Sequence, residues 1–267
     1  MLSLTACLPA KPVPQALRTT ATPLPRKRPL PQPPAPPSAP PNPSRVSNRE
    51  IAGITFTGVD FDSRKCRLIV VDQANGPGSQ YPDSAAAART HGGIAALNAG
   101  FFTPQGAPLG LVLASGKISG TWNSASSLGS GAWYETSSGH VAIARREQLG
   151  RHTATTMREL IQAGPLLVEN GRSIGGLETT KVSARSVILW DGGTRWWLGG
   201  SSPCTLAALT QALATGQPAD WPIRQALNLD GGRSSDLWIS SAIPGGPFLN
   251  RPPWNRPVRN FLVLVAK

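Results

Sequence analysis

A single acidic residue that precedes a pair of glycines is the strongest candidate for chemistry in this sequence. Asp230 follows the apolar residues 226–229, which are typical of a buried strand, so the strand would deliver one carboxylate at its end. The residues that come next can form a turn that binds an anion: Gly231, Gly232, Arg233, Ser234 and Ser235. The glycines allow a positive φ and close backbone approach, and the amides and hydroxyls are hydrogen-bond donors. Taken alone, an Asx turn at the end of a strand explains the same residues.

A second segment places a polar residue at the end of another predicted strand. Asn98 lies within the strand predicted over residues 94–102 and is followed by Gly100, Phe101 and Phe102. An asparagine amide can both donate to and accept from a sugar hydroxyl or a phosphate, and an aromatic ring can stack on a pyranose face. Core packing by the two phenylalanines is the alternative interpretation.

The elements that must position these residues are mostly short strands. Alternating or β-branched apolar runs predict strands over residues 51–60, 66–72, 94–102, 109–118, 139–146, 166–169, 184–191, 195–198, 226–229, 237–240 and 258–266. Capping residues and apolar spacing predict helices over 83–89, 155–163 and 205–215. Few helices are available as crossovers between parallel strands. We therefore expect an α+β fold with mixed, mainly antiparallel sheets, about ten strands and three short helices.

The N-terminal segment has a different composition from the rest of the chain. Residues 1–43 hold 14 of the 27 prolines, and residues 1–49 carry seven Lys or Arg and no Asp or Glu, which is more than half of the net charge of +12. Such a segment buries too little apolar surface to offset its ordering entropy, so residues 1–48 are predicted to be a disordered, basic, Pro-rich tail and residues 49–267 a single folded domain. No basic motif with a readable register predicts specific nucleic-acid binding.

The three cysteines bear on localisation. Residues 4–7 resemble a bacterial lipoprotein cleavage box ending at Cys7, so an exported domain on a lipid anchor and an ordinary tail with a stray thiol are both open interpretations. In an exported chain, Cys66 and Cys204 could pair, and two buried free thiols are the alternative. No apolar run is long enough to predict a membrane span.

Several motifs occur together in a specific order: residues 98–102, 108–111, 162–171, 184–186, 229–235 and 256–261. This order and spacing resembles the phosphodiester glycosidase family, whose bacterial relatives include exopolysaccharide-biosynthesis proteins. The resemblance covers roughly residues 50–267. Matched motif to motif, it implies site roles for Asn98, Gly100, Phe101, Gly164, Arg185, Asp230, Gly231, Gly232, Ser234, Ser235, Arg259 and Asn260. Two positions depart from the family pattern, because Arg233 replaces a third glycine and Asp236 follows the serine pair.

The resemblance implies hydrolysis of a sugar-phosphate diester at the glycosidic C–O bond on cell-envelope or exopolysaccharide material. Asp230 would act as a base for water or as a nucleophile. Arg185 would be the first choice to clamp the phosphate and Arg259 and Arg233 the second, while Asn98 would orient a sugar hydroxyl. No cofactor is required for this reaction, and a glycine turn is also compatible with a structural divalent cation. An exported protein, periplasmic or on the cell surface, would meet such a substrate.

Other residues and functions compete with this interpretation. Asp60 and Asp62 are reserve carboxylates, and the tryptophans at 190, 196, 197, 238 and 254 include candidates for a sugar platform. Three other functions are open: cleavage on the phosphorus side, a non-catalytic envelope module that binds phosphorylated glycan, and binding of an anionic polymer by the tail.

Overall fold

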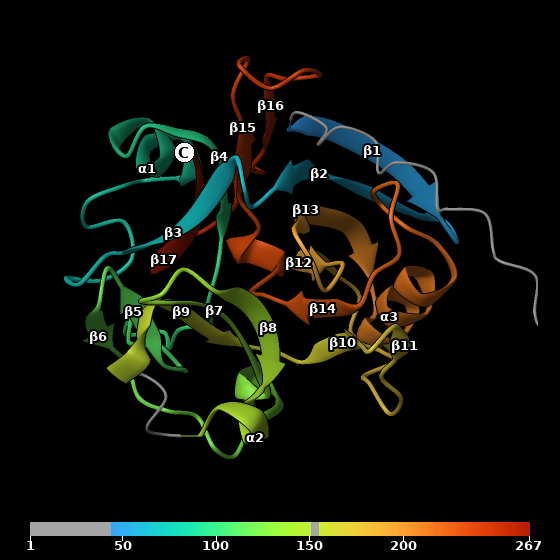
Figure 1. Cartoon of the computed structure of the whole chain (residues 1–267), viewed down its shortest axis with the longest axis horizontal. Helices are drawn as coiled ribbons and strands as arrows, with labels where there is room; N and C mark the ends of the chain where they lie inside the picture. Colours follow the sequence, from blue (N-terminus) through green and yellow to red (C-terminus); the bar gives the residue numbers. More distant parts are fainter. Residues whose placement is uncertain (1–43, 151–154) are drawn as a thin grey trace, which may run out of the picture. The chain divides into compact units, whose positions relative to one another are not determined.

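The computed structural model describes residues 44–150 and 155–267, which lie in one compact unit (Figure 1). The predicted lipid anchor at Cys7 and most of the predicted tail lie outside the described residues. Residues 45–48, which the composition assigned to the tail, belong to the first strand, β1 (Arg45–Ile51). This strand pairs with β2 (Ile54–Asp62) through a two-residue turn, Ala52 and Gly53, in which both φ angles are positive.

Three sheets make up the described part of the chain. The first sheet has the order β1, β2, β13 (Arg195–Cys204), β12 (Ser183–Trp190), β14 (Gln225–Asn228), β10 (Leu166–Glu169) and β11 (Arg172–Ser173). The second has the order β16 (Phe248–Asn250), β15 (Leu237–Ile239), β4 (Gly93–Asn98), β17 (Asn260–Ala266) and β3 (Cys66–Asp72). The third has the order β6 (Lys117–Ser119), β5 (Val112–Ala114), β9 (Met157–Ala163), β7 (Gly131–Thr136) and β8 (Val141–Arg145).

The fold is richer in strands than the sequence predicted. Seventeen strands are present among the described residues, against about ten expected, and every strand pairing there is antiparallel. The helices are α1 (Ser84–Thr90), α2 (Arg146–Leu149) and α3 (Leu206–Thr215). None of the helices in this part of the chain is long and apolar enough to cross a bilayer. The mainly antiparallel arrangement is thus confirmed, with more sheet and less helix than expected.

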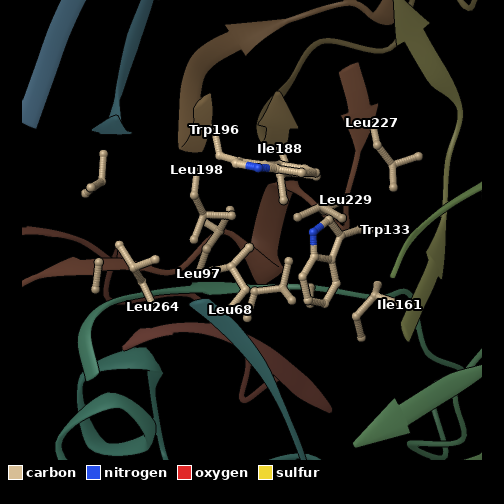
Figure 2. Close-up of a cluster of buried hydrophobic side chains, with 14 of the residues drawn as sticks. Leu68, Leu97, Trp133, Ile161, Ile188, Trp196, Leu198, Leu227, Leu229 and Leu264 are labelled. Carbon is tan, nitrogen blue, oxygen red and sulfur yellow. The ribbon is translucent and has the colours of Figure 1, made fainter. Parts of the chain in front are cut away.

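The main core lies where the three sheets face one another. Each sheet contributes large apolar side chains to one buried cluster, which Figure 2 shows: Leu68, Leu97 and Leu264 from the second sheet, Trp133 and Ile161 from the third, and Ile188, Trp196, Leu198 and Leu227 from the first. Trp190 stacks on Trp196 with ring centroids 5.2 Å apart, so these two indoles serve packing. Trp197 is also fully buried, and α3 packs beside it on the first sheet.

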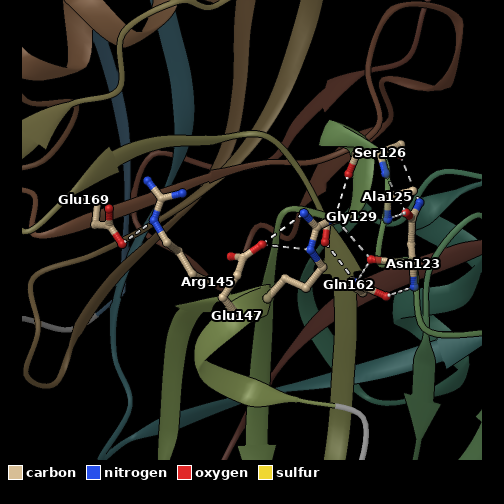
Figure 3. Close-up of polar contacts among 9 residues, drawn as sticks. Asn123, Ala125, Ser126, Gly129, Arg145, Glu147, Gln162 and Glu169 are labelled. Atoms are coloured by element: carbon tan, nitrogen blue, oxygen red, sulfur yellow. Dashed lines mark hydrogen bonds and ion pairs between the residues drawn. The ribbon is translucent and has the colours of Figure 1, made fainter.

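The helix predicted over residues 155–163 is wrong, because Met157–Ala163 form β9 in the centre of the third sheet. Its polar residues are buried and bonded to segments that are distant in sequence. Gln162 accepts hydrogen bonds from the backbone N–H groups of Leu111 and Asn123, at 3.0 and 2.9 Å, and donates to the Gly129 carbonyl at 2.9 Å (Figure 3). Glu159 accepts from the Val70 amide at 3.0 Å. These tertiary hydrogen bonds override the local helical pattern.

One further strand prediction needs correction, and the open question of the two cysteines is answered. Residues 109–118 form a hairpin of β5 and β6 around Ser115 and Gly116, both at positive φ, and β7 was not predicted. Cys66 and Cys204 are buried free thiols, Cys66 beside Ser44 and Cys204 beside Ser201. Of the two interpretations left open for these cysteines, the structure supports the unpaired one.

Candidate active site

The ends of β4 and β14 meet the middle of β12 at one place, although the three strands are distant in the sequence. Asn98 at the end of β4 donates from Nδ2 to the Asp230 carbonyl at 2.6 Å, and its Oδ1 accepts from the Ser186 hydroxyl of β12 at 2.7 Å. The Asp230 amide, just after β14, donates to the Ala99 carbonyl at 2.9 Å. The second sheet and the first sheet are therefore joined at the position of the candidate carboxylate, as the order of motifs predicted.

The glycine pair allows the turn after Asp230 to pack directly on β12. A Cβ atom at Gly231 would lie 2.6 Å from the Ala184 carbonyl oxygen, a distance that real Cβ atoms do not adopt. Gly232 has a φ of +62°, in the left-handed region that favours glycine. The backbone of the turn therefore lies against Ala184 and Arg185, and a side chain at Gly231 would force the two segments apart.

The carboxyl group of Asp230 has a pKa above the ordinary value for aspartate. Burial raises the pKa of Asp230 from 3.8 to about 6, although hydrogen bonds from the Ser234 side chain and the Gly231 amide and the charge of Lys181 lower it. The residue is only partly exposed to solvent. A carboxyl group with this pKa is mostly ionised at neutral pH and can still take up a proton, which suits it to proton transfer.

A cavity of about 730 Å³ opens beside the glycine pair. Its lining includes Thr55 and Thr57 of β2, Lys181, Gly231, Gly232, Arg233, Ser235 and Trp254. Two of these side chains are cations and none of the lining residues in the described part is acidic. The indole of Trp254 is exposed, and the Ser235 hydroxyl is buried without a hydrogen-bond partner in the described residues. Cations, hydroxyls and an exposed aromatic ring together suit a ligand that combines a sugar with an anionic group.

The loop that carries Trp254 is tied to the turn after Asp230. Arg251 forms an ion pair with the buried Asp236 at 3.2 Å, and the Arg256 amide donates to the Arg233 carbonyl at 2.9 Å. The Asn255 side chain donates to the Ser235 carbonyl. Asp236, which departs from the family pattern, also accepts two hydrogen bonds from Ser84 at the start of α1. The mouth of the cavity is therefore held in place by polar contacts on both sides of the serine pair.

Arg185 and Asn98 hold main-chain segments near the cavity but do not line it. Arg185 is buried, and its Nη2 and Nε donate to the Lys181 carbonyl at 2.7 Å and to the Cys204 carbonyl at 3.1 Å. It therefore fixes the segment that carries Lys181 and does not line the cavity. Asn98 is fully buried, and both ends of its amide are bonded to protein groups. In place of the phosphate clamp and the sugar contact that the resemblance implied, the structure shows two residues that hold the main chain.

Arg259 and Asn260 are also committed to protein partners. The Arg259 guanidinium forms a bidentate ion pair with Asp72, at 2.8 and 2.9 Å, and both side chains are 8% exposed. Asn260 is fully buried and accepts from the Gly100 amide at 2.6 Å. Neither residue lines the cavity. Lys181, which sequence patterns did not single out, lines the cavity instead.

The remaining predicted site residues serve packing. Phe101 packs against the main core, and Gly164 lies in the turn between β9 and β10, where a Cβ atom would lie 2.1 Å from the Ser127 carbonyl oxygen.

The two reserve carboxylates are bonded to other side chains, since Asp60 accepts from the Trp221 indole at 2.8 Å and Asp62 pairs with Arg64 at 2.6 Å. Among the described residues, no group of three or more His, Cys, Asp or Glu side chains gathers in a way that could hold a metal ion.

Among known protein families, one has a sequence pattern that this chain matches. A family model for phosphodiester glycosidases matches residues 91–265, about two thirds of the chain. The chain belongs to the phosphodiester glycosidase family. Within this family member, the matched residues include Lys181, Asp230 and Trp254, whereas β1, β2 and β3 lie outside the match. Thr55 and Thr57 on β2 therefore line the cavity from a part of the chain that the family model does not cover.

Solved structures share the fold of this phosphodiester glycosidase at low sequence identity. The catalytic domain of zebrafish N-acetylglucosamine-1-phosphodiester alpha-N-acetylglucosaminidase, auto-inhibited by its pro-peptide, matches with a TM-score of 0.56 and 16% identity over 84% of this chain and 82% of that chain. A hypothetical protein from Synechocystis matches with a TM-score of 0.54 and 18% identity over 84% and 61% of the two chains. A Burkholderia pseudomallei protein, provisionally described as exported, matches with a TM-score of 0.50 and 12% identity over 80% and 74%. Among curated protein sequences, none matches this chain significantly.

Proposed function

We propose that this protein hydrolyses a sugar-phosphate diester at the glycosidic C–O bond and releases a free sugar and a phosphomonoester. The observation that carries the proposal is the Asp230 carboxyl group, which has a pKa of about 6 and directly precedes the glycine pair that lines the cavity together with Lys181 and Arg233. The membership of the phosphodiester glycosidase family supports the same reaction class.

In the proposed mechanism, Asp230 supplies the negative charge that an oxocarbenium-like transition state requires. The bond between C1 of the sugar and the bridging phosphate oxygen breaks, and its electron pair leaves with the phosphate. A new bond forms between C1 and an oxygen of either water or the Asp230 carboxylate. In the first case Asp230 takes the proton of the water, and in the second a glycosyl ester forms and is hydrolysed by water. Phosphate is a good leaving group, so a strong general acid is unnecessary and Lys181 stabilises the departing charge.

The neighbouring residues would hold this geometry during the reaction. Asn98 bonds the carbonyl of Asp230, and Arg185 bonds the carbonyl of Lys181, so the carboxylate and the cation are each fixed through their main chain. Preorganised charges of this kind need little rearrangement as charge develops, which lowers the barrier. We propose no cofactor for this chemistry.

Isotope incorporation tests the proposal and separates it from cleavage on the phosphorus side. The probes are methyl diesters of N-acetylglucosamine, N-acetylgalactosamine, glucose, galactose and mannose 1-phosphate, incubated with the full chain in ¹⁸O water with and without EDTA. We expect methyl phosphate that carries no ¹⁸O in both conditions, because water attacks carbon. Release of methanol and ¹⁸O-labelled sugar 1-phosphate, or ¹⁸O in methyl phosphate, would assign the reaction to phosphorus. Binding of the probes without turnover would indicate a non-catalytic glycan-binding module.

The pH dependence of turnover should report the ionisation of Asp230. Because burial raises the pKa of Asp230 to about 6, kcat/KM should rise with pH and level off above about pH 6, where the ionised carboxylate predominates. Initial rates with the best methyl diester, measured from pH 4 to pH 9, give the profile. A rate that falls through pH 6 would instead make Asp230 a proton donor and contradict its proposed role.

We also propose that the substrate belongs to cell-envelope or exopolysaccharide material and that the protein is exported, with a lipid anchor at Cys7. The Pro-rich composition of residues 1–43 supports a spacer between an anchor and the catalytic domain. Labelling with a fatty-acid analogue in a bacterial host, with a Cys7→Ser chain as the control, tests the anchor.

A further inference from the structure

The cavity contains two cations that no carboxylate neutralises. Lys181 and Arg233 both line it, and among the residues that the structure describes neither of them forms an ion pair. Arg251, on the same loop as Trp254, does have a partner, because it forms an ion pair with Asp236 at 3.2 Å. Two unpaired cations in one cavity repel each other, and an anionic ligand would relieve this repulsion.

The two cations act at different places in the cavity. The charge of Lys181 acts on Asp230, where it lowers the pKa of the carboxyl group. The Arg233 side chain is exposed, and its Nη2 lies 3.5 Å from the backbone carbonyl of Trp254, whose indole is also exposed. Lys181 therefore belongs to the reacting end of the cavity and Arg233 to its mouth.

A phosphate diester carries one negative charge, and Lys181 suffices to balance it at the reacting end. We infer that Arg233 and Trp254 form a second subsite, which binds an additional anionic group, a carboxylate or a phosphate, on the alcohol side of the diester. This inference rests on the proposed function, because the alcohol side is defined by the bond that the enzyme cleaves. The guanidinium fork of Arg233 can hold two oxygens of either anion, and the Trp254 indole covers the carbon skeleton between the two charges.

The surroundings of this subsite are preorganised. The main chain at Arg233 is fixed by the amide of Arg256, and the loop that carries Trp254 is fixed by the Asn255 side chain on the carbonyl of Ser235. The two side chains that would contact the ligand, Arg233 and Trp254, are exposed, the latter at 67%. At this position the family pattern has a glycine, so the additional charge selectivity would be a property of this chain.

A matched series of substrates tests the subsite. The probes are diesters of N-acetylglucosamine 1-phosphate, or of the sugar 1-phosphate that the isotope experiment identifies, with glycerol, with glycerate and with glycerol phosphate. These alcohols are neutral, carboxylated and phosphorylated, respectively. We expect kcat/KM to be about tenfold higher for one or both of the anionic alcohols than for glycerol at low salt, and the ratio to decline with ionic strength because the subsite is exposed. The anionic diester with the higher ratio shows whether the subsite prefers a carboxylate or a phosphate.

Variants of the arginine separate the subsite from the general charge of the protein. Arg233→Gln should bring the ratio close to one, and Arg233→Lys should retain an intermediate ratio because it keeps the charge without the fork. Arg256→Gln removes the same charge from the same loop region outside the cavity lining and should keep the wild-type ratio. Equal rates for the three diesters in the wild type, or an unchanged ratio in Arg233→Gln, would overturn the inference while leaving the proposed hydrolysis intact. Absence of turnover with every diester would instead refute the proposed function.

Discussion

Asp230→Asn is expected to lower kcat of diester hydrolysis by about 10²–10⁴-fold, the range for loss of a positioned acid–base group. The substitution keeps the size of the side chain and an oxygen that can accept from the Gly231 amide, which donates to Asp230 at 2.9 Å. It removes the negative charge that the transition state requires. Substrate binding through Lys181 and Trp254 should persist, so the loss should fall on kcat more than on KM.

The same variant should be more stable than the wild type at neutral pH. Because the folded pKa of Asp230, about 6, lies above its ordinary value of 3.8, the folded state favours the protonated form. The stability that Asp230 contributes is thus present below about pH 4 and is lost as the pH rises through 6. Asparagine does not ionise, so urea denaturation at pH 7.5 should show a gain of about 1–3 kcal/mol, near the value for two pKa units after allowance for partial exposure.

Asp60→Asn is the matched control for both measurements. Burial also raises the pKa of Asp60, and its carboxylate bonds the Trp221 indole away from the cavity lining. The control should gain stability at pH 7.5 and retain wild-type turnover. A kcat for Asp230→Asn within tenfold of the wild type would remove Asp230 from the mechanism, whatever its effect on stability.

Asp230 and Asn98 could be selected from sequence because each follows a readable local signal at the end of a strand. Asp230 stands between an apolar strand and two glycines, and the glycines are required by the contact with Ala184. The strand β9 could not be predicted in this way. Glu159 and Gln162 interrupt its apolar pattern, and the groups that satisfy them, such as the Val70 and Leu111 amides, lie far away in the sequence.

The cavity lining could not be predicted for a different reason. Lys181 and Trp254 lie in loops, where no periodic pattern constrains a single residue, and only the fold brings them to the same cavity. Residue type alone also does not tell which arginine lines the cavity and which one bonds the main chain. Arg185 and Arg233 occur in comparable motifs, yet the guanidinium of Arg185 is turned toward main-chain carbonyls and that of Arg233 toward the mouth of the cavity. Arg185 lies on β12 and Arg233 in the short 3-10 helix after Asp230, so the direction of each guanidinium depends on how these segments pack in the completed fold.

Arg259 provides the second prediction with a large effect. Arg259→Gln should lower the free energy of unfolding at pH 7 by about 3–5 kcal/mol, because it leaves the buried Asp72 carboxylate without its ion pair. In the wild type Asp72 accepts two hydrogen bonds from Arg259 and one from the Ser119 hydroxyl at 2.9 Å, and only the last would remain. Arg259 also bonds the Gly106 carbonyl at 3.1 Å, so the loop between β4 and β5 would lose a tie as well.

A double-mutant cycle distinguishes this structural role from a phosphate clamp. Asp72→Asn in the Arg259→Gln background should recover part of the lost stability, because an uncharged amide at position 72 no longer needs a buried cation. Urea denaturation gives the coupling energy, and kcat and KM for the methyl diester are measured on the fraction that is folded at 25 °C. Since Arg259 does not line the cavity, KM should change little in any of the three variants. A large increase in KM for Arg259→Gln with unchanged unfolding would show that the guanidinium leaves Asp72 to bind the phosphate of the substrate.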